Sequence, residues 1–162
     1  MNDPEIVATL AVGTFPISKM AEKSWLEHMA SSPPNDMAFA IELIETGEHI
    51  GMSGIHQISW VNRTALTGSL IGRKDLHGQG LGTEAFNLRA RYCFETLNLN
   101  VLYSEFLEGN AASQRMQEKG GCKVWGVRPR AHYKEGRYLD SICTVLLRED
   151  WEGGLASRPL QS

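Results

Sequence analysis

Three glycines alternate at positions 78, 80 and 82, between a β-like segment that ends near Gly72 and a strongly periodic helical segment. Glycine has no Cβ, so this stretch can turn sharply and let a ligand approach the main chain closely. A turn that opens a helix also leaves several amide N–H groups without a helical partner, at the positive end of the helix dipole. The segment from Lys74 to Ala85 is therefore interpreted as an anion site, best suited to a pyrophosphate.

Other interpretations of the same glycines are open at this point. A plain glycine-rich connection needs no ligand at all. A dinucleotide-binding fingerprint requires two residues between its second and third glycines, whereas only Leu81 separates Gly80 from Gly82. A Walker loop ends in Gly-Lys-Ser/Thr, and here Thr83 follows Gly82 directly. A nucleotide-binding domain that uses this loop for another pyrophosphate stays an alternative.

Hydrophobic periodicity predicts an α+β order of elements around one mixed sheet. Three early β-like segments follow one another through short polar turns, which predicts an antiparallel meander that leads into the glycine loop. The helix after the loop carries two interleaved apolar rows, and such a wide apolar face belongs against a sheet. The predicted helices cover residues 18–30, 80–97 and 110–119, and the predicted strands cover residues 37–45, 50–60, 65–72, 101–108, 122–127 and 138–147.

A length of 162 residues fits a single domain. We assign this domain to residues 1–152 and expect residues 153–162 to form a disordered tail. The last two strands are expected to form a hairpin, joined by a polar loop through Arg130, His132, Lys134 and Gly136.

Composition excludes several classes of partner. The net charge of −3 argues against nucleic acid. No apolar run approaches the ~20 residues that span a bilayer, so no membrane partner is expected. Cys93, Cys122 and Cys143 are odd in number and widely spaced, which argues against a disulfide framework or a metal site and favours a reducing cytoplasm.

Two motifs of the chain resemble those of the GNAT acetyltransferases. His77-Gly78-Gln79-Gly80-Leu81-Gly82 is similar to the acetyl-CoA loop of that family, Arg/Gln-x-x-Gly-x-Gly/Ala, with histidine at the first position. Asn110-x-x-Ser113-x-Arg115-x-x-x-Lys119-x-Gly121 resembles a motif of the branch that includes the ribosomal-protein N-terminal acetyltransferases and the spermidine acetyltransferases. The predicted order of elements is also the GNAT order, so the resemblance covers most of the chain and implies a mostly antiparallel sheet flanked by helices.

The resemblance implies transfer of an acetyl group from acetyl-CoA, as cosubstrate, to a primary amine by direct attack in a ternary complex. The acceptor would be a protein N-terminal α-amine or a small amine or polyamine. Main-chain amides near the end of the third strand would hold the oxyanion, and the loop and the second motif would hold the coenzyme. The implied coenzyme contacts are Ile71, Gly72, His77, Gly78, Gln79, Gly80, Leu81, Gly82, Thr83, Asn110 and Ser113.

The resemblance also implies that Ser113 donates the proton that the leaving thiolate needs, with Tyr103 as the alternative donor. The general base stays open among four titratable residues near the predicted strand ends, of which Glu105 enters the predicted catalytic set: Glu105, Glu108, His56 and His132. The alternative is a module with the same fold that binds acyl-CoA or has a regulatory role but catalyses no reaction.

Members of the family usually begin with a strand and a helix before the segment matched here by residues 2–6. We therefore expect either that the chain begins inside a longer gene product or that its sheet lacks the first strand of the family. A sheet without that strand has an uncovered edge, and an uncovered edge favours pairing with a second chain. A homodimer is the expected assembly.

Overall fold

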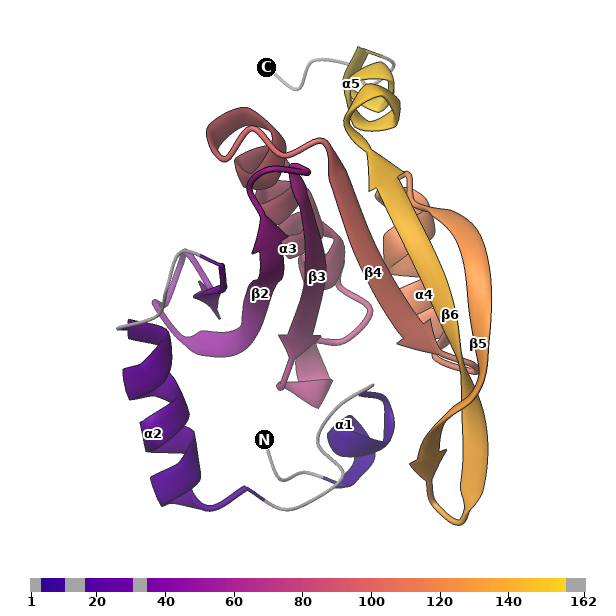
Figure 1. Cartoon of the computed structure of the whole chain (residues 1–162). Helices are drawn as coiled ribbons and strands as arrows, with labels where there is room; N and C mark the ends of the chain where they lie inside the picture. The colour runs from indigo at the N-terminus through magenta and orange to yellow at the C-terminus, as the bar shows by residue number, and fades with distance from the viewer. Residues whose placement is uncertain (1–3, 11–16, 31–34, 157–162) are drawn as a thin grey trace.

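The computed structural model of the chain describes residues 4–10, 17–30 and 35–156 (Figure 1). Its helices are α1 (Pro4–Ala8), α2 (Lys19–Ala30), α3 (Leu81–Arg91), α4 (Ala111–Lys119) and α5 (Arg148–Ala156), with a 3₁₀ turn η1 (Lys74–Leu76) and a π-helical turn η2 (Tyr92–Thr96). Its strands are β1 (Met37–Glu42), β2 (His49–Ser59), β3 (Thr64–Ile71), β4 (Val101–Leu107), β5 (Lys123–Lys134) and β6 (Arg137–Leu147). None of the described helices is long and apolar enough to cross a bilayer.

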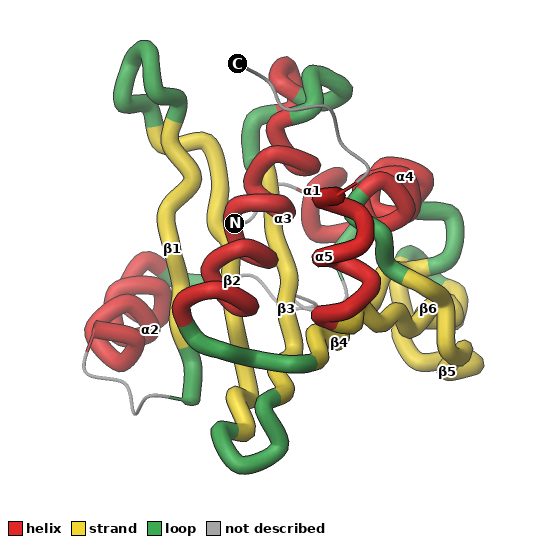
Figure 2. The backbone as a smooth tube through the Cα atoms, turned by 90° about the horizontal axis from the view of Figure 1, so that it is seen from above, coloured by secondary structure: helices red, strands yellow, loops and turns green. Residues whose placement is uncertain are grey.

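One six-stranded sheet organises these elements, in the order β1-β2-β3-β4-β6-β5 (Figure 2). Neighbouring strands are antiparallel except β3 and β4, which run in the same direction. The predicted α+β fold with a mixed, mostly antiparallel sheet is therefore confirmed. Within the described ranges no strand precedes β1, which lies at one edge of the sheet.

The parallel pair β3 and β4 is joined only at its beginning. Paired positions run from Thr64–Val101 to Leu66–Tyr103, and beyond them the ladder ends. Figure 1 shows the two strands separating toward their carboxyl ends, with α1 facing the gap between them. A sheet that splits in this way opens a space whose walls are main-chain edges.

The hydrophobic core lies between α3 and the sheet. Phe86, Ala90 and Cys93 recur at helical spacing on one face of α3 and η2, and they are nearly inaccessible to solvent. They pack in one cluster with sheet residues such as Ile55 and Leu102. The wide apolar face predicted for this helix is thus confirmed, with one exchange: Leu88, predicted on that face, is 56% exposed, whereas its neighbour Arg89 is buried.

Two predicted segment ends are wrong. The polar residues Arg130, His132 and Lys134 belong to β5, because the hairpin continues past a bulge between Arg128 and His132 up to Lys134. Pro129 lacks the N–H of a ladder residue, and the Arg130 amide next to it donates to the Asp140 carboxylate at 2.7 Å instead. At the other end α5 continues to Ala156, so residues 153–156 are helical, and the rest of the predicted tail lies outside the described residues.

Candidate active site

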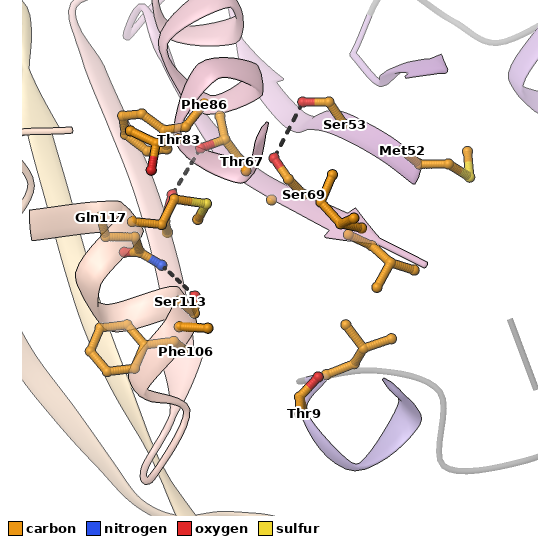
Figure 3. Close-up of a pocket in the computed structure, with 18 of the residues that line it drawn as sticks. Thr9, Met52, Ser53, Thr67, Ser69, Thr83, Phe86, Phe106, Ser113 and Gln117 are labelled. Atoms are coloured by element: carbon orange, nitrogen blue, oxygen red, sulfur yellow. Dashed lines mark hydrogen bonds between the residues drawn. The ribbon is translucent and has the colours of Figure 1, made fainter. Parts of the chain in front are cut away.

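A cavity of about 540 Å³ occupies the gap between β3 and β4. The Thr67 and Ser104 hydroxyls, 2.8 Å apart, close its narrow end, where the two strands begin to diverge. The walls come from β2, β3 and β4, from the glycine loop with α3, from α4 and from α1. Figure 3 shows Ser113 and Gln117 on one side of the space, Met52 and Ser69 on another, and Thr9, which directly follows α1, across from them.

The main chain of β3 supplies one wall. Gly72 donates its amide to the Ile50 carbonyl at 2.8 Å, so this N–H is used within the sheet. Successive residues of an antiparallel strand direct their N–H and C=O groups to opposite neighbours, so Ser69 and Ile71 direct theirs away from β2 and toward the gap. Ile71 lines the cavity and Gly72 does not. Of the two residues predicted to hold the oxyanion, Ile71 therefore faces the cavity and Gly72 does not, and Ser69 faces it together with Ile71.

The glycine loop forms the entrance to α3. Gly78 and Gly80 have φ values of +83° and +90°, a conformation that glycine adopts without steric cost. The Gly80 carbonyl accepts the Thr83 and Glu84 amides at 2.9 and 3.0 Å, which starts the helix. Among the described residues, the amides of 78–82 donate to no other main-chain group. This open set of N–H groups at a helix start fits a pyrophosphate.

Side chains hold the loop in place. His77, which stands where the family has arginine or glutamine, places Nε2 3.0 Å from the Ile71 carbonyl oxygen and so ties the loop to β3. Gln79 turns away from the cavity and donates to the Asp75 carbonyl at 3.0 Å. Arg73 forms a two-point ion pair with Asp75 at 2.8 and 2.6 Å, and its hydrogen bonds hold the pKa of Asp75 below the usual range. Gln79 is therefore a support of the loop rather than a cavity contact.

Helix α4 contributes the second predicted motif. Asn110 caps this helix by accepting the Ser113 amide at 3.0 Å, and its Nδ2 donates to the carbonyl of Thr9, the residue after α1, at 3.1 Å. The Ser113 hydroxyl oxygen accepts Gln117 Nε2 at 3.4 Å, so its own hydrogen is available to a group in the cavity. Both predicted residues line the cavity. Gln117, 3% exposed, was not predicted and fixes Ser113 from behind.

The predicted acid–base residues are placed differently. Glu105 reaches the cavity lining, but one carboxylate oxygen accepts from Arg128 and, at 2.7 Å, from Ser141. Tyr103 is not among the lining residues and packs its ring against Trp125, with centroids 6.2 Å apart. The structure therefore does not bring Tyr103 to Ser113. Glu108 and His132 also lie outside the lining.

His56 is the predicted base that the structure places best. It lines the cavity from β2, and its Nδ1 lies 3.2 Å from the Asp36 carboxylate. A Cβ on Gly54 would overlap the imidazole, so the glycine makes room for this ring orientation. With Nδ1 held by Asp36, Nε2 is the nitrogen left to exchange a proton.

Sequence reasoning missed Arg89, which lines the cavity from α3. Its position was detectable, since it lies three residues after Phe86 and four before Cys93, on the helical stripe that faces the core. Among the described residues no group of three or more histidine, cysteine or acidic side chains is arranged to hold a metal ion.

Comparisons with known proteins agree on one family. Residues 1–123 match the model of the acetyltransferase (GNAT) domain. The chain is 32% identical over 111 residues to the N-acetyltransferase YdaF from Bacillus subtilis (strain 168), whose name provisionally calls it ribosomal. That match covers 68% of this chain and 60% of YdaF, less than two thirds of its length. The N-acetyltransferase p20 from Bacillus licheniformis, named as uncharacterized, is 26% identical over 153 residues, which cover 94% of this chain and 85% of p20.

Among solved structures, the spermidine N-acetyltransferase from Vibrio cholerae in complex with CoA and spermine has the same fold. The TM-score is 0.82 at 20% identity, over 93% of this chain and 87% of that one. The family uses acetyl-CoA, and the expected class of enzyme, an acetyl-CoA-dependent N-acetyltransferase, is confirmed at the level of the family. With its split sheet and its amide-lined loop, this chain belongs to the GNAT acetyltransferase family.

Proposed function

We propose that the chain acetylates an α-amine, taking the acetyl group from acetyl-CoA while both substrates are bound. The observation that carries this proposal is the continuity of one cavity, which runs from the open amides at the start of α3 to His56 and Ser113. Acetyl-CoA carries its thioester at one end of the pantetheine arm and its pyrophosphate at the other. It therefore needs an anion site and a reaction site within one continuous cavity.

The glycine loop passes a fit test for the pyrophosphate. A Cβ added at Gly78 or Gly80 would meet no described atom within 4 Å, so the space over the loop is open to a ligand. The Ser69 and Ile71 amides along β3 would orient the extended pantetheine arm and its carbonyl group. Ser113 on α4 would stand beside the sulfur.

The reaction requires two proton transfers. A bond forms between the amine nitrogen and the acetyl carbon, the C–S bond breaks, the nitrogen loses a proton and the sulfur gains one. His56, held by Asp36 at 3.2 Å, is our proposed base, and Ser113 is the proposed donor to sulfur. Glu105 is less suited as the base because Arg128 and Ser141 both donate to its Oε2 and hold the carboxylate toward themselves.

The charge of the cavity favours a monoamine over a polyamine. Among the described lining residues, Glu105 is the one acidic side chain, whereas Arg89, Arg115 and Lys119 carry positive charge. A polyamine with several positive charges would find no acidic cluster among these described lining residues.

The energy needed to deprotonate the amine points the same way. Neutralising a lysine-type amine of pKa ~10.4 at pH 7 costs about 4.6 kcal/mol, whereas an α-amine of pKa ~7.8 costs only about 1 kcal/mol. A single half-exposed histidine is sufficient for the second case. The proposed acceptor is therefore an α-amine.

A matched acceptor panel tests this proposal. Acetyl transfer is measured by mass spectrometry with α-amino compounds and short peptides on one side and spermidine, spermine and alkylamines of pKa near 10 on the other. We expect acetylation of α-amines at pH 7 and slow or absent acetylation of the polyamines. Preference for a polyamine would refute the assignment of the acceptor, and binding of coenzyme A without any turnover would refute the assignment of the reaction.

We also propose that the chain forms a homodimer in the cytoplasm. The sheet has two edges, β1 and β5, and β5 carries the more apolar one, with Val124 and Trp125 each 61% exposed. Pairing along an edge would cover these side chains. Sedimentation at micromolar concentration tests this: Trp125→Glu should convert a dimer to a monomer, and a monomeric wild-type protein would contradict the proposal.

A further inference from the structure

Arg89 is a buried cation in the wall of the cavity. Its side chain is 5% exposed, and its Nη1 donates to the Ser53 hydroxyl and the Gly68 carbonyl, both at 2.8 Å, and to the Ser69 hydroxyl. The Phe86 ring lies beneath the guanidinium, with the centroid 5.3 Å from the guanidinium carbon. All these contacts are neutral.

No anion among the described residues compensates this charge. The ion pairs of the described residues do not include Arg89. Cys93 and Cys122 are the two thiols whose charge would interact with Arg89. Both stay neutral at neutral pH, because burial raises the pKa of Cys93 to about 12 and that of Cys122 to about 11. Burial lowers the pKa of Arg89 only to about 10, so the guanidinium is positive at neutral pH.

One edge of the guanidinium is unused. All the hydrogen bonds of Arg89 start from Nη1, and Nε and Nη2 donate to no atom of the described residues. A fully buried side-chain nitrogen without a hydrogen-bond partner would count as buried and unsatisfied, and neither Nε nor Nη2 of Arg89 does so. Both nitrogens are therefore accessible, and Arg89 lines the cavity, so this edge reaches the cavity space. Two adjacent N–H groups of arginine match the two oxygens of a carboxylate.

The position of Arg89 separates it from the pyrophosphate loop. Arg89 follows Leu81, the first residue of α3, by a rise of about 12 Å along the helix axis. Its partners Ser53 and Ser69 lie on β2 and β3, on the wall where the Ser69 amide faces the gap. The buried charge therefore lies away from the start of α3, where the pyrophosphate is proposed to bind, and next to β2 and β3.

We propose that Arg89 binds a carboxylate of the substrate at the reacting end of the cavity. The inference rests on the proposed acetyl transfer and names a further group of the substrate: either the molecule that carries the acceptor α-amine also carries a carboxylate, or the transferred acyl group itself carries one. The two sources share the same contact, a side-on pair between the carboxylate and the Nε–Nη2 edge. Ser53 and Ser69 hold the opposite side of the guanidinium and so fix its orientation.

Binding of product analogues tests the site without turnover. N-acetylglycine and N-methylacetamide share the acetamide group and differ by the carboxylate. With coenzyme A present, calorimetry should give at least tenfold tighter binding of N-acetylglycine to the wild-type protein, because charge-assisted hydrogen bonds are the stronger class. Arg89→Met, which keeps the volume, should abolish the difference, and Arg89→Lys should retain only part of it.

The matched control is Arg91→Met, on the same helix but exposed, where Arg91 pairs with Glu95 at 4.0 Å. It should leave both affinities at the wild-type values. The comparison of the two analogues on the wild-type protein needs no variant, so poor folding of Arg89→Met does not remove the test. Equal affinity of the wild-type protein for the two compounds excludes a carboxylate on the acceptor, and together with equal turnover of the two donors compared below it overturns the proposal. An equal loss of both affinities in a folded Arg89→Met protein also overturns it.

Turnover separates the two sources of the carboxylate. Glycine is compared with ethylamine as the acceptor, and succinyl-CoA with butyryl-CoA as the donor. In one of these pairs the wild-type protein should prefer the compound that carries the carboxylate, and Arg89→Met should lose that preference. A preference in the acceptor pair assigns the carboxylate to the amine, and a preference in the donor pair assigns it to the acyl group. Equal turnover in both pairs would refute the carboxylate site and leave acetyl transfer intact. Carboxylate-dependent binding without any turnover would refute the transfer and leave the site intact.

Discussion

Gly80→Ala tests the anion loop without removing any side chain. Gly80 has φ +90° at the start of α3, a region where a residue with a Cβ is strained by about 1–2 kcal/mol. The added Cβ would meet no described atom within 4 Å, so the strain comes from the backbone alone. The loop relieves it by rotating its amides away from the ligand. Each lost amide–phosphate bond is worth about 1.5–3 kcal/mol, so the Kd for coenzyme A should rise at least tenfold.

Gly47→Ala is the matched control for backbone strain. Gly47 has φ +69° in the turn between β1 and β2, and a Cβ there also meets no described atom within 4 Å. Both variants should lose a similar amount of unfolding free energy in urea titrations, and calorimetry should show weaker coenzyme binding only for Gly80→Ala. Wild-type affinity in a folded Gly80→Ala protein would refute the argument, and so would an equal loss in both variants.

Three further predictions concern the reacting groups and the buried thiols. Ser113→Ala should lower kcat about 10²–10⁴-fold, the range of a proton-transfer group, with the Kd for coenzyme A unchanged; a weaker Kd with full turnover would make Ser113 a binding contact only. His56→Gln should lower kcat at pH 7 and remove the rise of rate with pH that a neutral imidazole base produces, and a pH profile identical to the wild type would exclude His56 as the base. Burial raises the pKa of Cys93 to about 12 and that of Cys122 to about 11, so iodoacetamide at pH 8 should modify both far more slowly in the native protein than in urea, as peptide mass spectrometry can follow. Since these thiols are neutral in the folded state, the unfolding free energy should fall as the pH rises from about 9 toward 11.

Local patterns predicted the parts of the fold that neighbouring residues determine. The alternating glycines predicted a loop that opens a helix, and the structure has Gly80 in a left-handed conformation at the start of α3. Asn110 and Ser113 were predicted together, and one caps α4 through the amide of the other. Such relations span few residues, so they are readable in the sequence.

Relations between distant strands were not readable in the same way. Whether Gly72 or Ile71 offers an amide to the gap depends on the pairing register of β3 with β2, which the sequence does not fix. Tyr103 faces Trp125 rather than Ser113 because of the register between β4 and the β5–β6 hairpin. Arg89 was overlooked because hydrophobic periodicity treats arginine as a surface residue. In the structure its buried guanidinium donates hydrogen bonds to the hydroxyls of Ser53 and Ser69.

The central claim is that one cavity joins the anion loop to His56 and Ser113 and transfers an acetyl group to an α-amine. The most direct measurement is mass spectrometry of acceptor mixtures incubated with acetyl-CoA and the wild-type protein at pH 7, with Gly80→Ala and Ser113→Ala in parallel. The account predicts that the wild-type protein forms an acetylated α-amine. Gly80→Ala should form this product slowly at low acetyl-CoA and reach the wild-type rate at high acetyl-CoA. Ser113→Ala should form it slowly at every concentration of acetyl-CoA. Coenzyme binding by the wild-type protein without an acetylated product from any acceptor would contradict it.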